Sequence, residues 1–373
     1  MVQFSSLFSS LSRNILIKNG RNPRADAGRE AADALAKEAR KNDLMLSSPG
    51  TINSNGSDNF ACVFSKGGRK GVNQDCFVVW EGFGCQEDMV FCGIFDGHGP
   101  WGHQVAKRVR KLMPSSLLCN WQETLALNSL NPGSGMELDR SLHPFDIWKQ
   151  SYLKTFSAID QDLEQHSDIY SFHSGTTALT IVRQGDLIVM ANIGDSRAVL
   201  ATISDDGNLK PVQLTVDLKP NLPQESERIT QSKGRVFSSD DEPGVYRIWL
   251  PNGEALRGPG LAVSRAFGDY YFKGFGLISE PEITQRNITC RDQFVILATD
   301  GVWDVISNEE AVKTVASAPD REGSAKRLVE SAVCGWKQKK RGIAMDDISA
   351  ICIFFHSSDP SLYVNPGKLQ LAE

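Results

Sequence analysis

The sequence predicts an α+β fold in which two stacked β-sheets carry helices on their outer faces. Three observations support this prediction. Apolar runs of strand length fall into two groups along the chain, amphipathic helical segments lie between and after these groups, and strands and helices do not alternate one by one as in a doubly wound parallel sheet. The 373 residues suffice for one large domain or two ordinary ones, and 40% hydrophobic with 23% charged residues is a globular balance.

The first half of the chain supplies one group of strands and two helices. Strands are predicted at 60–66, 76–83 and 89–95. A helix is expected over 102–113, because Val105, Val109 and Leu112 recur on one helical face. A second amphipathic helix is expected over 146–164, after a loop at 128–141.

The second half of the chain supplies the other group of strands and two more helices. Strands are predicted at 176–183, 186–194 and 197–203. Residues 219–260 contain five prolines and are expected to be irregular, and a loop of this length in a compact domain is usually functional. The remaining expected elements are a strand at 294–298, helices at 308–317 and 322–337, and a last strand at 348–355.

The bulk properties exclude several classes of protein. A formal net charge of -5 gives no reason to expect nucleic acid as a partner. No run of 18 apolar residues is present, so no membrane span is expected. The eight cysteines form no CxxC pair and no zinc spacing with His, which indicates a reducing compartment.

The first 25 residues are rich in Ser and contain four basic residues but no acidic one. This composition weakly resembles an organellar transit peptide, although a flexible basic tail explains it better because the Arg content is low. We therefore expect a cytoplasmic or nuclear protein, with an organellar location as the alternative.

Acidic residues stand where predicted strands begin or end. Asp96-Gly97 and Asp300-Gly301 each follow an apolar run, while Asp75 precedes one and Asp195 lies in a turn. Asp346 and Asp347 open the last strand. Converging carboxylates need a cation, and oxygen ligands without Cys or clustered His suit Mg²⁺ or Mn²⁺. Asp-Gly is also a common turn dipeptide, so the pattern alone leaves both interpretations open.

Seven segments, in order, resemble the type 2C protein phosphatases, the metal-dependent Ser/Thr phosphatase family. Their sequences are most like those of plant members. These segments are KGVNQD (70–75), GIFDGHGPWG (93–102), SGTTAL (174–179), ANIGDSRAV (191–199), LAVSRAFGD (261–269), LATDGVWDV (297–305) and DDISAI (346–351). The resemblance covers residues from about Phe60 to Phe355, which is most of the chain.

The resemblance implies a four-layer α/β/β/α sandwich, with two antiparallel sheets and a metal centre at one end. It also implies three regions: an N-terminal extension and linker at 1–57, a phosphatase domain at 58–357 and a C-terminal tail at 358–373. Within the domain, a flap is expected at about 216–260.

The resemblance assigns metal ligands to two ions, Mg²⁺ or Mn²⁺, and to a weak third. Asp96 is expected to bridge the two ions and Gly97 to contribute its carbonyl oxygen. Asp300 and Asp346 would bind one ion, and Asp75 would act through bound water. Asp195, together with Asp300, would serve the third ion.

The implied reaction is direct hydrolysis of phosphoserine or phosphothreonine in a phosphoprotein. A metal-bridged water attacks phosphorus in line, and His98 protonates the leaving oxygen as general acid. We expect a monomer. Two positions depart from the family pattern: Lys70 replaces a phosphate-binding Arg, for which Arg69 could substitute, and Gln74 replaces a Glu.

Two alternatives remain open. A pseudophosphatase would bind phosphoproteins without turnover, and Lys70 with Gln74 motivates this possibility. Another two-metal hydrolase such as a nuclease is disfavoured by the acidic charge balance.

Overall fold

The computed structural model describes residues 50–52, 61–130, 142–165, 170–251 and 260–356. The predicted tail at 358–373 and nearly all of the predicted extension at 1–57 lie outside the described residues, as do residues 131–141 of the predicted loop.

One sheet of the structure has six strands in the order β1-β2-β16-β15-β9-β10, and every neighbouring pair is antiparallel. Its strands are β1 Gly50–Ile52, β2 Ala61–Lys66, β9 Arg197–Ile203, β10 Leu209–Gln213, β15 Asp292–Ala298 and β16 Ile348–Phe354.

The second sheet has five strands in the order β14-β8-β7-β4-β3, and it is also antiparallel throughout. Its strands are β3 Cys76–Glu81, β4 Met89–Phe95, β7 Ala178–Gln184, β8 Leu187–Ile193 and β14 Glu282–Asn287. A small antiparallel sheet, in the order β13-β6-β5, extends this region with β5 Gly97–His98, β6 Gly175–Thr176 and β13 Phe267–Gly268.

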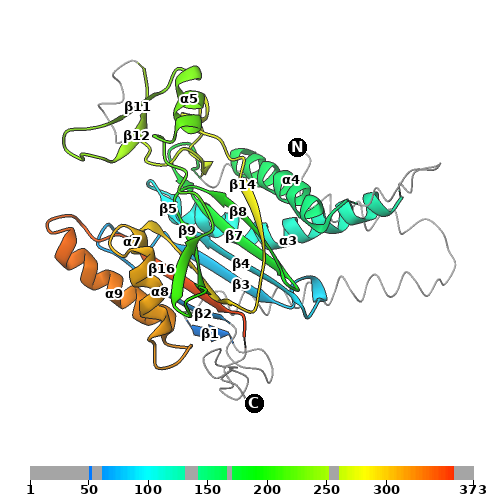
Figure 1. The fold of residues 1–373 in the computed structure, drawn as a ribbon. Helices are drawn as coiled ribbons and strands as arrows, with labels where there is room; N and C mark the ends of the chain where they lie inside the picture. The colour runs from blue at the N-terminus through cyan, green and yellow to red at the C-terminus, as the bar shows by residue number, and fades with distance from the viewer. Residues whose placement is uncertain (1–49, 53–60, 131–141, 166–169, 252–259, 357–373) are drawn as a thin grey trace, which may run out of the picture. The chain divides into compact units, whose positions relative to one another are not determined.

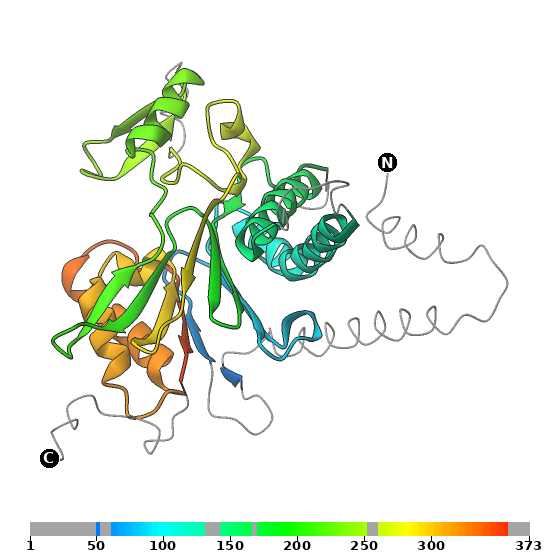
Figure 2. The same cartoon turned by 45° about the vertical axis from the view of Figure 1, so that its right-hand side comes forward.

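The two large sheets stack face to face, and helices cover the outer faces (Figures 1 and 2). Helices α3 Gly102–Leu130 and α4 Pro144–Gln165 pack on the five-stranded sheet. Helices α7 Asp300–Trp303, α8 Asn308–Ala316 and α9 Ser324–Lys339 pack on the six-stranded sheet. The predicted four-layer α/β/β/α sandwich is therefore confirmed.

The central strands show why these sequences need four layers. In β15 and β16, every second side chain faces the other sheet, where Val295, Leu297, Ile351 and Ile353 join a buried cluster with side chains of β4, β7 and β8. The alternate side chains of both strands face the helices instead. An apolar run buried on both faces thus requires a layer on each side.

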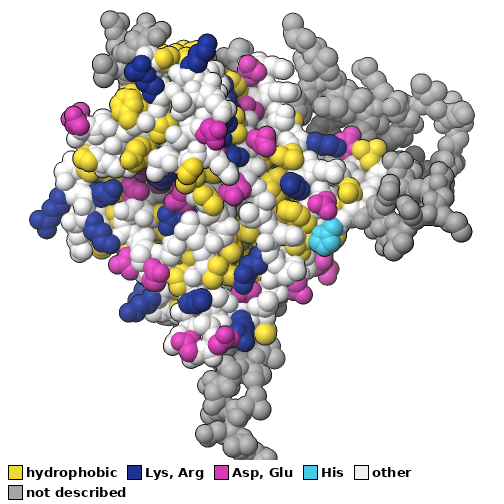
Figure 3. Space-filling view, turned by 45° about the horizontal axis from the view of Figure 1, so that its top comes forward, with side chains coloured by type: hydrophobic (Ala, Val, Ile, Leu, Met, Phe, Trp, Pro, Cys, Tyr) yellow, Lys and Arg dark blue, Asp and Glu magenta, His cyan; other side chains and the backbone are white. Residues whose placement is uncertain are grey.

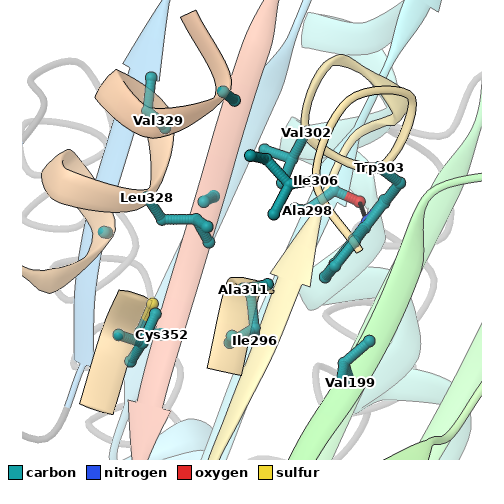
Figure 4. Close-up of a cluster of buried hydrophobic side chains, with 14 of the residues drawn as sticks. Val199, Ile296, Ala298, Val302, Trp303, Ile306, Ala311, Leu328, Val329 and Cys352 are labelled. Carbon is teal, nitrogen blue, oxygen red and sulfur yellow. Dashed lines mark hydrogen bonds between the residues drawn. The ribbon is translucent and has the colours of Figure 1, made fainter. Parts of the chain in front are cut away.

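The cluster between the six-stranded sheet and its helices is drawn in Figure 4. Ile296 and Cys352 are opposite each other in the β15–β16 register, and Leu328 of α9 and Ala311 of α8 belong to the same buried cluster. Helix α8 begins with a capping box, in which the Ser307 hydroxyl accepts from the Glu310 N–H and the Glu310 carboxylate accepts from the Ser307 N–H.

Two predictions need correction. Helix α3 does not stop near residue 113 but runs through Pro114 to Leu130, so residues 128–130 of the predicted loop are helical. Proline removes one helical N–H, yet the helix continues because Leu117, Leu118 and Trp121 remain buried beyond it.

Residues 219–260, predicted to be irregular, are not wholly so either. It contains α5 Pro223–Gln231 and an antiparallel hairpin of β11 Arg235–Ser238 and β12 Tyr246–Trp249, while residues 252–259 lie outside the described part. Pro223 starts α5, where the missing N–H costs nothing, so this proline begins a helix instead of breaking one. Two short helical turns complete the described elements, at Phe83–Cys85 and at α6 Tyr270–Lys273.

Candidate metal centre and active site

The predicted acidic residues all lie at one end of the sandwich. Asp96 follows β4 and Asp75 precedes β3, its antiparallel neighbour. Asp300 follows β15 in the same way and Asp346 comes shortly before the antiparallel β16. Asp195 connects β8 of one sheet to β9 of the other. The topology therefore brings together carboxylates that are up to 271 positions apart in the sequence, from Asp75 to Asp346.

The backbone at Asp96 and Gly97 is held tightly. The Asp96 N–H donates to Thr177 Oγ1 at 3.1 Å, and its carbonyl accepts from the Thr177 N–H at 2.9 Å. A Cβ at position 97 would lie 2.6 Å from the carbonyl oxygen of Gly102 and 2.7 Å from that of Gln74. Only glycine fits at position 97, because backbone atoms close it on both sides.

The loop before β3 is fastened to the start of β16 by Asp347. One carboxylate oxygen of Asp347 accepts from the Gly68 N–H at 2.7 Å, and the other accepts from the Gln74 N–H at 2.8 Å. Position 301 must also be glycine, because a Cβ there would lie 2.0 Å from the Asp347 carbonyl oxygen. Asp347 thus holds together the segments that carry Asp75 and Asp346, and its backbone packs against Gly301, next to Asp300.

Asp75 is buried and only half satisfied. Its Oδ2 accepts hydrogen bonds from Ser349 Oγ at 2.7 Å and from Thr299 Oγ1 at 3.1 Å. Its Oδ1 is buried without a hydrogen-bond partner among the described residues. Burial raises the pKa of the carboxyl group to about 7, and the negative charge of Asp347 adds to this effect against the Ser349 hydrogen bond.

The electrostatics show that the carboxylates interact with one another. Burial raises the pKa of Asp96 well above its ordinary value, and the charges of its neighbours raise it further; these are Asp75, Asp300, Asp346 and Asp195. Burial does the same for Asp300, with contributions from Asp195, Asp346 and Asp304. Like charges held this close are stabilised by a cation.

Two lysines carry positive charge into this acidic region. Lys70, predicted to bind phosphate, forms an ion pair with Asp346. Lys219 Nζ lies 2.9 Å from Asp195 Oδ2, and the charge of Asp195 is the main cause that raises the pKa of Lys219. The Arg69 backbone N–H donates to the Met345 carbonyl oxygen at 2.8 Å, and this bond keeps the 68–70 segment beside Asp346.

The donor set fits a hard divalent cation. All candidate ligands are oxygens, and Asp75 Oδ1 and Gln74 Oε1 are buried acceptors without hydrogen-bond partners among the described residues. In the described part of the chain, no three acidic, His or Cys side chains lie close enough together, as they stand, to hold an ion.

His98 lies next to the acidic region on β5, and its partner was not foreseen from the sequence. His98 Nε2 lies 2.5 Å from Asp269 Oδ2, and the His98 and Asp269 side chains are 27% and 4% exposed. Burial alone lowers the pKa of His98, but the Asp269 carboxylate outweighs it and the net pKa is raised.

Sequence reasoning also missed Asp304 and Lys219. Asp304 raises the pKa of Asp300, and Lys219 lowers it. Asp304 also interacts electrostatically with Lys219. Asp304 stands one helical turn after Asp300 in LATDGVWDV, so the spacing was a usable signal for it. Asp269 ends the segment LAVSRAFGD, which was a usable signal for it, whereas nothing in the local sequence marks Lys219.

Three further features concern the surface, the helices and the cysteines. On the face in Figure 3, the described Lys and Arg side chains are interspersed with Asp and Glu and form no continuous basic band. Within the described ranges, no helix combines the length and the apolar character that crossing a membrane requires. All eight cysteines lie in described segments, where they are free thiols.

Comparison with known proteins gives a consistent result. A family model described as "Protein phosphatase 2C" matches residues 62–334. "Probable protein phosphatase 2C 34" of Arabidopsis thaliana is 61% identical over 97% of this chain and 99% of its own length. "Probable protein phosphatase 2C 48" of rice is 54% identical over 96% of this chain and 99% of its own.

Among solved structures, a serine-threonine phosphatase 2C from Toxoplasma gondii is 26% identical, with a TM-score of 0.69 over 83% of this chain and 98% of that one. The family model, these near full-length relatives and this fold agree with the motifs and with the acidic end of the sandwich. The chain belongs to the protein phosphatase 2C family and is a protein serine/threonine phosphatase.

Proposed function

We propose that this protein hydrolyses phosphoserine and phosphothreonine in proteins directly, with two Mg²⁺ or Mn²⁺ ions bound at the acidic end of the sandwich. When bound, the ions supply an activated water and neutralise charge on the phosphoryl group. Asp96, the Gly97 carbonyl, Asp300 and Asp346 would hold them, and Asp75 would act on their water shell. A weak third ion would use Asp195 and Asp300.

The observation that carries the proposal is that the topology gathers Asp75, Asp96, Asp195, Asp300 and Asp346 from both sheets at one end of the sandwich, where the charges of the other four raise the pKa of Asp96. Folding places these carboxylates in a partly buried, like-charged setting that costs free energy without a cation. A chain selected for stability alone gains nothing from this arrangement, whereas a metal enzyme needs it.

The residues of the chain have separate tasks. Lys70 supplies a positive charge beside Asp346, from which it could reach a phosphate, with Arg69 next to it. His98 holds a proton for the oxygen that leaves phosphorus. No covalent phosphoenzyme is needed in this scheme, because water provides the attacking oxygen.

The experiment is a Mn²⁺ titration of phosphopeptide hydrolysis with wild-type protein, Asp300→Asn and a matched control. Asp205→Asn is that control, because Asp205 is an exposed carboxylate that pairs with Arg291 away from the site. We expect millimolar-range activation in the wild type and the control. Asp300→Asn should lose at least ~10²-fold in kcat/KM.

The pseudophosphatase alternative rests on Lys70 and Gln74. Under that alternative, the wild type binds the phosphopeptide but shows no turnover at any Mn²⁺ concentration, and Asp300→Asn changes nothing. Hydrolysis of DNA in place of the phosphopeptide would point to a nuclease instead.

The remaining proposals concern the state of the protein. We infer a monomer with a cytoplasmic or nuclear location, the organellar location being the alternative. Light scattering measures the mass of the purified chain, and a fluorescent fusion to either end reports the compartment.

A further inference from the structure

Asp269 ends the segment LAVSRAFGD and has no place in the reaction as described so far. The residue is 3% exposed and has a left-handed backbone, with φ 49° and ψ 44°. A non-glycine residue in this region is uncommon and strained, and such residues gather at functional sites. The Asp269 N–H donates to the Ser174 carbonyl oxygen at 3.0 Å, which holds the residue in this conformation.

The small sheet β13-β6-β5 brings Asp269 to His98. His98 of β5 pairs with Gly175 of β6, and Gly175 pairs with Gly268 of β13, directly before Asp269. A Cβ on Gly175 would lie 2.1 Å from Asp269 Oδ2. The carboxylate therefore occupies the space that a side chain on the middle strand would fill, and it reaches the imidazole across that strand.

The contact itself is specific. Asp269 Oδ2 lies 2.5 Å from His98 Nε2, and the aspartate side chain is 4% exposed while the histidine side chain is 27% exposed. A buried carboxylate on one ring nitrogen fixes both the orientation and the tautomer of an imidazole. With Nε2 engaged by Asp269, Nδ1 is the ring nitrogen left for another partner.

We propose that Asp269 is the positioning residue for His98: it holds the ring by Nε2 so that Nδ1 presents the proton to the leaving oxygen of the substrate. This inference rests on the proposed function, in which His98 is the general acid. Asp269 does not touch the substrate in this scheme and acts only through His98.

The proton balance of the step is simple. A water oxygen forms the new bond to phosphorus, and the bond from phosphorus to the seryl oxygen breaks. The seryl oxygen keeps the bonding electron pair and takes the proton from His98, which becomes neutral. A proton from the attacking water passes to solvent, and solvent reprotonates the imidazole, so the net reaction is hydrolysis.

The test uses two substrates that differ in their need for an acid. A seryl oxygen is a poor leaving group, whereas p-nitrophenolate leaves phosphorus without help. General acid catalysis contributes ~10²–10⁴-fold, so Asp269→Asn should lower kcat for a phosphoserine peptide by ~10²-fold at saturating Mn²⁺. The loss for p-nitrophenyl phosphate should stay within a few-fold, and KM should change little for either substrate.

Asp160→Asn is the matched control. Asp160 accepts from the Gly268 N–H at 3.3 Å and from Lys273 and Ser279, so it braces the same segment without touching His98. This variant should lower the melting temperature without changing the ratio of the two activities. If Asp269→Asn behaves like Asp160→Asn, the role of Asp269 is structural and the proposal is overturned.

Two further measurements keep the outcomes distinguishable. In a His98→Ala background, Asp269→Asn should add no further loss specific to the phosphoserine peptide. If His98→Ala lowers kcat much more for the phosphoserine peptide than for p-nitrophenyl phosphate, but Asp269→Asn does not, this inference alone fails. If His98→Ala lowers kcat equally for both substrates, His98 is not the general acid, and the proposed mechanism fails together with this inference.

The wild-type protein also tests the contact directly, and a variant is used only to assign the signals. Ring ¹⁵N–¹H correlations, assigned by their loss in His98→Ala, should show a proton on Nε2 that exchanges slowly with water. A His98 ring without a proton on Nε2 would overturn the proposal.

Discussion

Glu225 is the acidic centre of a buried ion cluster that fixes helix α5. Its carboxylate accepts two hydrogen bonds from Arg228, at 2.8 and 2.7 Å, and one from Arg265 Nη2 at 2.7 Å. The Glu225 side chain is 2% exposed. Arg265 also donates to the Glu280 carbonyl oxygen, so the cluster ties α5 to the segments before α6 and β14.

The stability that this ion cluster contributes follows from the pKa of Glu225. Burial alone would raise it, but the two arginines lower it from 4.5 to about 2. This shift corresponds to ~3 kcal/mol of folding stability at pH 7. Because the two arginines are partly exposed, solvent screening reduces this contribution to ~2 kcal/mol. Because the pKa is lowered on folding, this stability is fully present above pH 4.5 and is lost as the pH falls toward 2.

Glu225→Gln should therefore unfold ~3 kcal/mol more easily than the wild type at pH 7, since it leaves two guanidinium groups without their counter-charge. The assay is urea denaturation followed by Trp fluorescence at pH 7, 5, 4 and 3 without added metal. Glu227→Gln, on the same helix and exposed, is the control and should change stability by less than ~0.5 kcal/mol.

The difference between the wild type and Glu225→Gln should shrink by ~2 kcal/mol below pH 4.5, as the wild-type carboxylate takes up a proton. A difference below ~1 kcal/mol at pH 7 would show that the arginines do not stabilise the charged Glu225 carboxylate. A difference that stays constant from pH 7 to pH 3 would lead to the same conclusion.

Three other perturbations follow from the packing and from the site. Leu328→Ala removes a fully buried side chain from the cluster in Figure 4 and should cost ~2–5 kcal/mol in urea denaturation; a cost below ~1 kcal/mol would contradict the packing. Gly301→Ala places a Cβ 2.0 Å from the Asp347 carbonyl oxygen, so it should lower the melting temperature and abolish hydrolysis, and unchanged activity would show that this backbone contact is wrong. Mn²⁺ at ~100-fold its Kd should stabilise the wild type by ~2.7 kcal/mol in thermal unfolding but should not stabilise Asp96→Asn. Equal stabilisation of both proteins would show that Mn²⁺ does not bind at Asp96.

Local patterns predicted most of the fold because they are set by burial. The alternation in β15 and β16 follows from a layer on each side, and the 3.6-residue period of α4 follows from one buried face. The errors came from proline, which local reasoning treats as a breaker. Pro114 lies inside α3 and Pro223 begins α5, and only packing and position in the helix distinguish these cases.

The acidic residues could be named from the sequence because each follows or precedes a strand, and antiparallel pairing brings such ends together. The contacts of His98 and Lys70 could not be named. His98 meets Asp269, 171 positions later, through a three-stranded sheet of two-residue strands, and Lys70 meets Asp346 after 276 positions. Strands this short carry no periodic signal, so only the folded chain shows the pair of His98 and Asp269.

We propose that the carboxylates at one end of the sandwich jointly hold hard divalent ions. The most direct measurement is anomalous diffraction from crystals grown with Mn²⁺. We expect two strong manganese peaks, with Asp96 touching both and Asp300 and Asp346 on one of them. A map without manganese between these side chains, from crystals of protein that hydrolyses phosphopeptides, would show that these carboxylates do not hold the catalytic ions.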